Sequence, residues 1–114
     1  MNDKNTLYIL WTNADLDTSL RMVMMYSTNS KVYQWWEHVV VIIWGATAKL
    51  AAENAQVREA MKVAMNAGVR FTACAACARQ LGVVETLQAQ GVEVVGWGEA
   101  LTQLLKNKEP LITV

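Results

Sequence analysis

Apolar residues along this chain fall into short continuous runs, and most runs are followed by a stretch in which apolar residues recur at helical spacing. Residues 7–12 form the first run, which ends at the turn-forming Asn13 and predicts a short buried strand. Residues 39–45 form the clearest run, which is rich in β-branched residues and apolar up to Gly45. A strand of that kind belongs in the centre of a parallel sheet that is covered on both faces.

The rest of the chain repeats this alternation of strand and helix. Three more strands are expected at residues 69–73, 92–97 and 111–114. Helices are expected from Asp15 onward, as one long helix over residues 47–66, and over residues 76–82, 83–91 and 99–108. This alternation over residues 1–114, without a linker or a repeat, predicts a single α/β domain. Its expected architecture is a three-layer α/β/α arrangement around a mostly parallel five-stranded sheet.

The first helix is apolar on more than one side. Residues 22–26, with the sequence MVMMY, are five apolar residues in a row. One helix face cannot bury such a run, so some of these side chains are expected to lie at the surface. Exposed apolar patches usually mark interfaces, and we therefore expect the chain not to be a monomer.

Composition and charge narrow the function class. With 54% hydrophobic and 18% charged residues, the chain can form a core and is not disordered. A formal net charge of zero gives no electrostatic reason to bind nucleic acid or an anionic membrane. No apolar run approaches the roughly 20 residues that span a bilayer, and the polar start MNDKNT lacks the order of a signal peptide. Two cysteines without an export signal indicate a reducing cytoplasm.

The residues at the ends of the predicted strands are candidates for a binding site. The carboxyl ends of parallel strands share one edge of the sheet, where open α/β folds bind ligands. Small residues there let a ligand approach the backbone, and tryptophans can wall a pocket, although closing the end of the core is the commoner use of a tryptophan. The candidate ligand-binding residues at these ends are Trp11, Thr12, Asn13, Trp44, Gly45, Ala75, Ala76, Trp97 and Gly98.

The two cysteines of the chain, Cys74 and Cys77, are separated by two alanines where the third strand gives way to a helix. A thiol at such a junction faces unpaired backbone N–H groups and the positive end of the helix dipole, which favour the nucleophilic thiolate. Cys77 follows one turn later, close enough to interact with Cys74. Two inert buried cysteines are the alternative, because buried cysteine is common.

Other uses of a CxxC motif fit this sequence less well. A zinc site needs about four ligands, and the single histidine, His38, stands at the start of the second strand, roughly 20 Å from the cysteine edge. Thioredoxin-like proteins carry CxxC after an early strand and opposite a cis-proline, whereas the one proline here is Pro110. The chain has neither a P-loop nor a GxGxxG motif. We therefore expect no metal and no cofactor.

The stretch GVRFTACAACARQLGV, together with VVVIIWGATAKL and GVEVVGWGEAL, resembles the DsrE/DsrF-like family of small α/β sulfur-handling proteins over nearly the whole chain. The most specific elements are a cysteine at the end of the third strand and a glycine eight residues later, here Cys74 and Gly82. The resemblance implies a flavodoxin-like, DsrE-like fold, a persulfide on Cys74, and Cys77 as an accessory thiol. It also implies a homo-oligomer (a dimer, trimer or hexamer) and sulfur donor and acceptor proteins as partners.

These observations give one leading hypothesis and two alternatives. The leading hypothesis is an intracellular sulfur carrier or sulfurtransferase-like protein, in which Cys74 accepts a sulfane sulfur and the N–H groups of Ala75 and Ala76 stabilise the anion. The first alternative is a non-catalytic module that binds a small ligand at the strand ends. The second is a structural or interaction subunit of a larger assembly. Neither nucleic acid nor a membrane is an expected partner.

Overall fold

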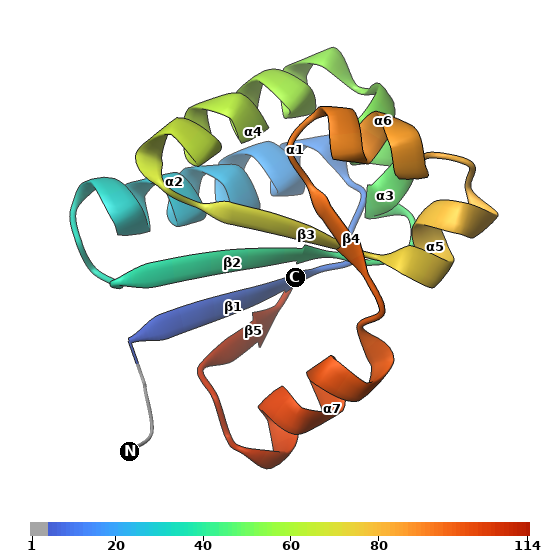
Figure 1. Cartoon of the computed structure of the whole chain (residues 1–114). Helices are drawn as coiled ribbons and strands as arrows, with labels where there is room; N and C mark the ends of the chain where they lie inside the picture. Colours follow the sequence, from blue (N-terminus) through green and yellow to red (C-terminus); the bar gives the residue numbers. More distant parts are fainter. Residues whose placement is uncertain (1–4) are drawn as a thin grey trace.

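A five-stranded, all-parallel β-sheet forms the middle layer of the computed structural model, which describes residues 5–114 (Figure 1). The strand order is β4-β3-β2-β1-β5. The strands are β1 (Thr6–Trp11), β2 (His38–Ile43), β3 (Arg70–Cys74), β4 (Glu93–Val95) and β5 (Leu111–Thr113). The predicted parallel sheet, with the long apolar run in its central strand, is confirmed. Most of the polar start MNDKNT lies outside the described residues.

The helices cover the two faces of the sheet unequally. They are α1 (Leu16–Thr18), η1 (Ser19–Met24, a π-helix), α2 (Met25–Val32), α3 (Thr47–Glu53), α4 (Ala55–Ala67), α5 (Ala75–Gln80), α6 (Val84–Ala89) and α7 (Gly98–Lys106). Those from α1 to α6 lie on one face, and α7 alone lies on the other (Figure 1). None of the helices in residues 5–114 is long and apolar enough to cross a membrane.

The strand order explains this distribution. From β1 to β4 each strand lies beside the preceding one, always stepping in the same direction across the sheet. Right-handed crossovers in one direction place their helices on the same face. The step from β4 to β5 runs back past three strands, so the same handedness places α7 on the opposite face.

The core lies mainly between the sheet and the layer formed by α1 to α6. Alternate residues of β1, β2 and β3 point into it, as the two-residue period of a strand requires. These residues are Leu7, Ile9, Trp11, Val39, Val41, Ile43, Phe71 and Ala73. In β2 the intervening residues Val40 and Ile42 are buried as well, so the central strand is covered on both faces. This cover is what a continuous apolar strand needs to leave no apolar surface in water.

The first helix begins where the sequence predicts it, but its geometry differs. The Asp15 carboxylate accepts hydrogen bonds from the Thr18 N–H and hydroxyl, both at 2.9 Å, and these bonds lower the pKa of Asp15. The following turns form the π-helix η1, in which Met24 is buried, and Met25, the first residue of α2, is half exposed. The apolar run therefore does leave apolar side chains at the surface.

The single helix predicted over residues 47–66 is wrong, because the chain breaks at Asn54 into α3 and α4. Asn54 is extended, and its side-chain oxygen accepts a hydrogen bond from the Val57 N–H at 3.0 Å. An asparagine side chain competes with the helical backbone in this way and favours the N-cap position over the helix interior. The predicted end of the helix is confirmed, since Gly68 closes α4 with a left-handed φ of 108°.

Candidate functional site

All the strands end at one edge of the sheet, and at two neighbouring strands there the chain continues to opposite faces of the sheet. The parallel register places the ends of β1, β2, β3 and β4 at this edge. The chain leaving β3 enters α5 on one face, whereas the chain leaving β4 enters α7 on the other (Figure 1). Such a divergence is the topological switch point at which open α/β sheets bind ligands. Cys74, the last residue of β3, lies at this point.

Cys74 ends β3 and is also the N-cap of α5. Its backbone is extended (φ −62°, ψ 118°), and the residue is buried, with 6% of its surface exposed. Ala75 is buried behind it and Ala76 is exposed. These two alanines occupy the first two positions of α5, and no side chain caps the start of this helix. The predicted strand-to-helix junction at Cys74 is confirmed.

Cys77 is half-buried and interacts directly with Cys74. Cys74 and the backbone N–H of Gly45 are the neighbours whose hydrogen bonding and charge act on the Cys77 thiol. Burial raises the pKa of Cys77, and the bond and charge of Cys74 raise it further, while the Gly45 N–H partly offsets them. At neutral pH Cys77 therefore keeps its proton and can donate it towards the Cys74 sulfur.

The loop that carries Gly45 is fixed by a buried threonine at the start of α3. The Thr47 hydroxyl donates to the Trp11 carbonyl at 2.7 Å and accepts from the Trp44 N–H at 3.1 Å. It therefore joins the ends of β1 and β2. Gly45 itself has a φ of 70°, a left-handed conformation that costs glycine little. The loop thereby holds Gly45 beside Cys77.

The three tryptophans at the strand ends have different surroundings. Trp11 is completely buried, and its indole N–H donates to the Ser19 hydroxyl at 3.0 Å. This corrects the interpretation of Trp11 as a pocket wall, because a side chain without exposed surface closes the core and contacts no ligand. Trp44 and Trp97 are half-buried. The indole N–H of Trp97 donates to the Thr72 hydroxyl at 2.9 Å, which fixes the loop after β4 over β3.

The polar candidates at the end of β1 are used by the fold. Thr12 and Asn13 are exposed, and both of their N–H groups donate to the carbonyl of Val114 at 2.7 and 3.0 Å. The Asn13 side chain accepts from the Asp15 N–H at 2.9 Å. Gly98 is exposed at the first turn of α7. These contacts organise the edge of the sheet, and their part in ligand binding stays a prediction.

Hydroxyl groups inside the strand ends were missed by the sequence reasoning. Thr47 and Thr72 are both buried, and each joins two segments of the site edge. Thr72 also donates to the Glu93 carbonyl at 2.9 Å. Such residues can be recognised in a sequence as a threonine within an otherwise apolar strand or just after it, because a buried hydroxyl without a hydrogen-bond partner costs free energy and will therefore bond a neighbouring segment.

The cysteine pair lies outside the hollows of the surface. Five hollows of about 300 to 590 Å³ stand out on the described residues, and neither cysteine lines them. One of about 380 Å³ borders the ends of β1 and β2, with Ala14, Ala46 and Asn54 among its lining residues. The shared concavity predicted around the strand ends stays a prediction.

His38 lies at the opposite end of the sheet from Cys74. It is the first residue of β2, is exposed, and lies 3.6 Å from the Glu37 carboxylate. Within residues 5–114, no group of three or more His, Cys, Asp or Glu side chains is arranged to hold a metal ion. His38 is therefore placed neither to ligate a metal with Cys74 nor to act as its base within one subunit.

This chain is similar to one known protein family and to two proteins of solved structure. The profile of the DsrE/DsrF-like family matches residues 5–114. A conserved protein of unknown function from Bacteroides thetaiotaomicron is 36% identical and superposes with a TM-score of 0.94, over 96% of this chain and 95% of that chain. A protein of unknown function from Methanobacterium thermoautotrophicum shares the fold at 15% identity, with a TM-score of 0.72 over 96% of this chain and 97% of that chain. No curated protein matches. This chain belongs to the DsrE/DsrF-like family.

Proposed function

We propose that this protein carries sulfur as a persulfide on Cys74, with Cys77 as an accessory thiol, in the manner of a sulfurtransferase-like relay protein. The observation that carries the proposal is the direct interaction of the two thiols at the switch point, together with the Gly45 N–H that faces Cys77. Membership in a family associated with sulfur relay supports it.

In the loading step, the Cys74 thiolate attacks the outer sulfur of a donor persulfide, R–S–SH. A new S–S bond forms on Cys74 while the S–S bond of the donor breaks, and the donor leaves as the thiolate R–S⁻. The sulfane sulfur is transferred without net oxidation, so the step needs no other reactant. The protonated Cys77 stabilises the negative charge on Cys74 by hydrogen bonding, as charge-assisted hydrogen bonds do.

Two delivery routes follow from the loaded state. An acceptor thiolate can attack the outer sulfur and leave as its persulfide, which returns Cys74 to the thiolate. Alternatively, the Cys77 thiolate attacks the inner sulfur, expels HS⁻ and forms a disulfide with Cys74, which a thiol reductant must then reduce. Because the pKa of Cys77 is raised, little Cys77 thiolate is present near neutrality, and transfer to an acceptor thiolate is therefore the faster of the two routes.

The surface over α2 and α4 supports an oligomer as the working form. Met25 and Val63 are 52% and 53% exposed and line one hollow of about 300 Å³. Apolar side chains grouped in this way favour contact with another chain. The proposed partners are further copies of this chain, as a dimer, trimer or hexamer, and the sulfur donor and acceptor proteins. Thiols that must stay reduced between cycles favour the cytoplasm as the place of action.

Mass spectrometry tests the proposal directly. The protein is treated with a small persulfide donor, digested without reductant, and searched for one added sulfur atom. We expect the added sulfur on Cys74, its complete loss in Cys74→Ser, and normal loading of Cys77→Ser with slower release of sulfide. Unmodified Cys74 with every donor would contradict the proposal and favour the non-catalytic alternative, a ligand-binding or interaction subunit.

A further inference from the structure

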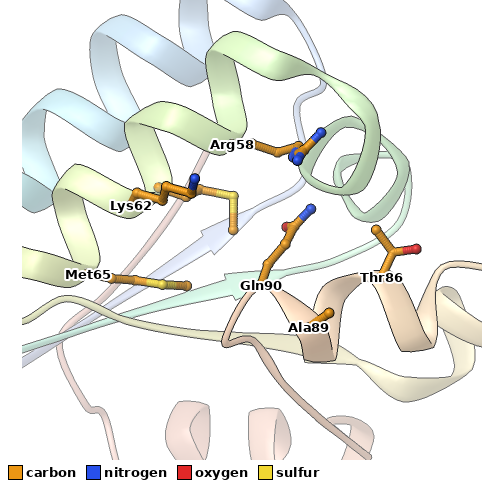
Figure 2. A pocket seen from close by; sticks show the side chains of 7 residues that line it. Arg58, Lys62, Met65, Thr86, Ala89 and Gln90 are labelled. Carbon is orange, nitrogen blue, oxygen red and sulfur yellow. The ribbon is translucent and has the colours of Figure 1, made fainter.

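A hollow of about 450 Å³ lies between α4 and α6, in the helix layer and apart from the cysteines (Figure 2). Cavities of this size are typical of small-molecule sites, which bury most of a ligand of modest size. Its floor is apolar, because Met61 is nearly completely buried and Met65 is half-buried. The Met65 side chain also packs beside Gly91, since a Cβ built on that glycine would lie 3.5 Å from the Met65 sulfur. The hollow therefore offers apolar contact below and an opening above.

Two cations stand on one wall of this hollow. Arg58 and Lys62 lie four residues apart on α4, so they share one side of that helix. Both are exposed, and within residues 5–114 no ion pair joins either of them to an acidic side chain. Cations that line a hollow without a carboxylate partner favour an anionic ligand. The Arg58 guanidinium can bind a carboxylate or a phosphate through two parallel hydrogen bonds.

The opposite wall contains a buried hydrogen-bond acceptor without a partner. The Gln90 side-chain nitrogen donates to the Ala52 carbonyl at 3.2 Å, which fixes the orientation of the amide, since a carbonyl can only accept. The other amide atom, Oε1, is buried and has no hydrogen-bond partner in the described residues. Figure 2 shows the Gln90 side chain rising from the end of α6 beneath Arg58, with Thr86 beside it on α6. Leaving such an acceptor unsatisfied costs free energy, and a ligand N–H or O–H would remove that cost.

From these three observations we propose that the hollow binds a small organic anion: a carboxylate or phosphate monoester that carries an apolar part and an N–H or O–H donor. The anionic head lies between Arg58 and Lys62, the apolar part lies on Met61 and Met65, and the donor faces Gln90 Oε1. The site is independent of the sulfur chemistry, because neither cysteine lines the hollow.

Four small probes separate the three contributions. 4-Aminobenzoate carries the anion, the ring and an N–H donor. Benzoate lacks the donor, methyl 4-aminobenzoate lacks the charge but keeps the ring and the donor, and phenyl phosphate replaces the carboxylate of benzoate with a phosphate. Each is titrated into the ¹⁵N-labelled protein and followed by amide chemical shifts. We expect shifts confined to α4 and α6, the tightest carboxylate binding for 4-aminobenzoate, and much weaker binding of its methyl ester. The tighter of benzoate and phenyl phosphate identifies the class of anion.

Matched variants assign the contributions to residues. Arg58→Gln is expected to weaken benzoate binding about tenfold, as loss of a charge-assisted hydrogen bond does when solvent partly screens it. Lys106→Gln, which removes an equal charge from α7 on the other face, is expected to leave binding unchanged. Gln90→Met is expected to keep benzoate binding and to abolish the preference for 4-aminobenzoate over benzoate. Cys74→Ser is expected to bind every probe as the wild type does.

Three results would overturn the proposal, and the first two need only the wild-type protein. One is equal binding of 4-aminobenzoate and its methyl ester, which would show that charge plays no part. Another is a set of α4 and α6 shifts that follow protein concentration and not the probe, which would make the hollow a contact between copies of the chain. The third is an unchanged preference for 4-aminobenzoate in a folded Gln90→Met variant, which would remove the role of the buried acceptor.

Discussion

Replacing Thr47 with valine tests whether the hydroxyl that joins β1 and β2 also organises the cysteine site. Valine has nearly the shape of threonine, so the change removes hydrogen bonds and leaves the packing in place. The completely buried hydroxyl donates to the Trp11 carbonyl at 2.7 Å and accepts from the Trp44 N–H at 3.1 Å. These two backbone groups also bond to each other at 3.1 Å, so neither is orphaned. We therefore expect a loss of about 1–2 kcal/mol in the free energy of unfolding.

This loss corresponds to a fall in Tm of roughly 4–8 °C for a domain of this size, measurable by circular dichroism. Thr47→Ser, which keeps the hydroxyl, should recover most of the difference. Thr102→Val is the matched control, because it removes an exposed hydroxyl that bonds the Gly98 carbonyl on α7, and its expected effect is within about 0.5 kcal/mol. A Thr47→Val protein as stable as the wild type, or a Thr47→Ser protein as unstable as Thr47→Val, would refute the reasoning.

The same substitution has a consequence for the site. A looser loop withdraws the Gly45 N–H from the Cys77 sulfur, and that N–H is the contact with another residue that lowers the pKa of Cys77. Its loss raises the pKa of Cys77 further, and less thiolate is then present at a given pH. We expect slower alkylation of Cys77 by iodoacetamide in Thr47→Val than in the wild type, while Thr102→Val reacts at the wild-type rate. Faster alkylation of Cys77 in Thr47→Val would contradict the role assigned to Gly45.

Three further predictions concern the fold and the assembly. The Asp15→Ala variant should have a lower Tm than the wild type at pH 7, and this difference should vanish as the pH of the thermal melts falls below 3.8. The reason is that a carboxyl group with a lowered pKa stabilises the fold only while it is ionised, so a difference that stays constant with pH would contradict the role of Asp15 as a cap. Ile42→Ala should lower the free energy of unfolding, measured with urea, by about 2–5 kcal/mol, because the Ile42 side chain is fully buried in the central strand. The control Leu105→Ala removes an exposed side chain and should lower it by less than about 0.5 kcal/mol; equal losses would show that the second face of the sheet is poorly packed. Met25→Glu should shift sedimentation towards the 12.7 kDa monomer, and a wild-type protein that already sediments as a monomer would remove the proposed interface.

The strands were predictable because burial on both faces leaves a strong pattern. The amino-acid sequence alone places Val40 and Ile42 in a central strand, since no polar residue interrupts residues 39–43. The order of the strands was not predictable, because it depends on which neighbours pair through the backbone, and backbone groups are the same in every residue. The break at Asn54 was missed for a different reason. Its effect comes from one side-chain hydrogen bond, while the apolar periodicity continues across it.

The sequence predicts the edge of the sheet at which the candidate site lies, but not the contacts that the side chains make there. Parallel connectivity alone brings Gly45 and Cys74 to the same edge, as the structure confirms. Whether an aromatic ring there faces the core or a ligand depends on side-chain direction, which the sequence does not specify, and Trp11 turned inward to bond Ser19. The cationic hollow between α4 and α6 was missed entirely. It joins residues some 30 positions apart on two helices, and no local pattern records that distance.

The strand order sets the exit of β3, which ends in Cys74, apart from the exits of β1 and β2. The loops after β1 and β2 both turn to the same face, and Thr47 and Val114 use several of their backbone groups in hydrogen bonds. At the end of β3 the neighbouring chain, which leaves β4, turns to the opposite face, while the Trp97 indole bonds Thr72 and holds the loop after β4 over β3. The first N–H groups of a helix have no partner within the helix. In the proposed sulfur carrier, the N–H groups at the start of α5 and the Cys77 thiol proton are therefore the donors available to a sulfur anion on Cys74.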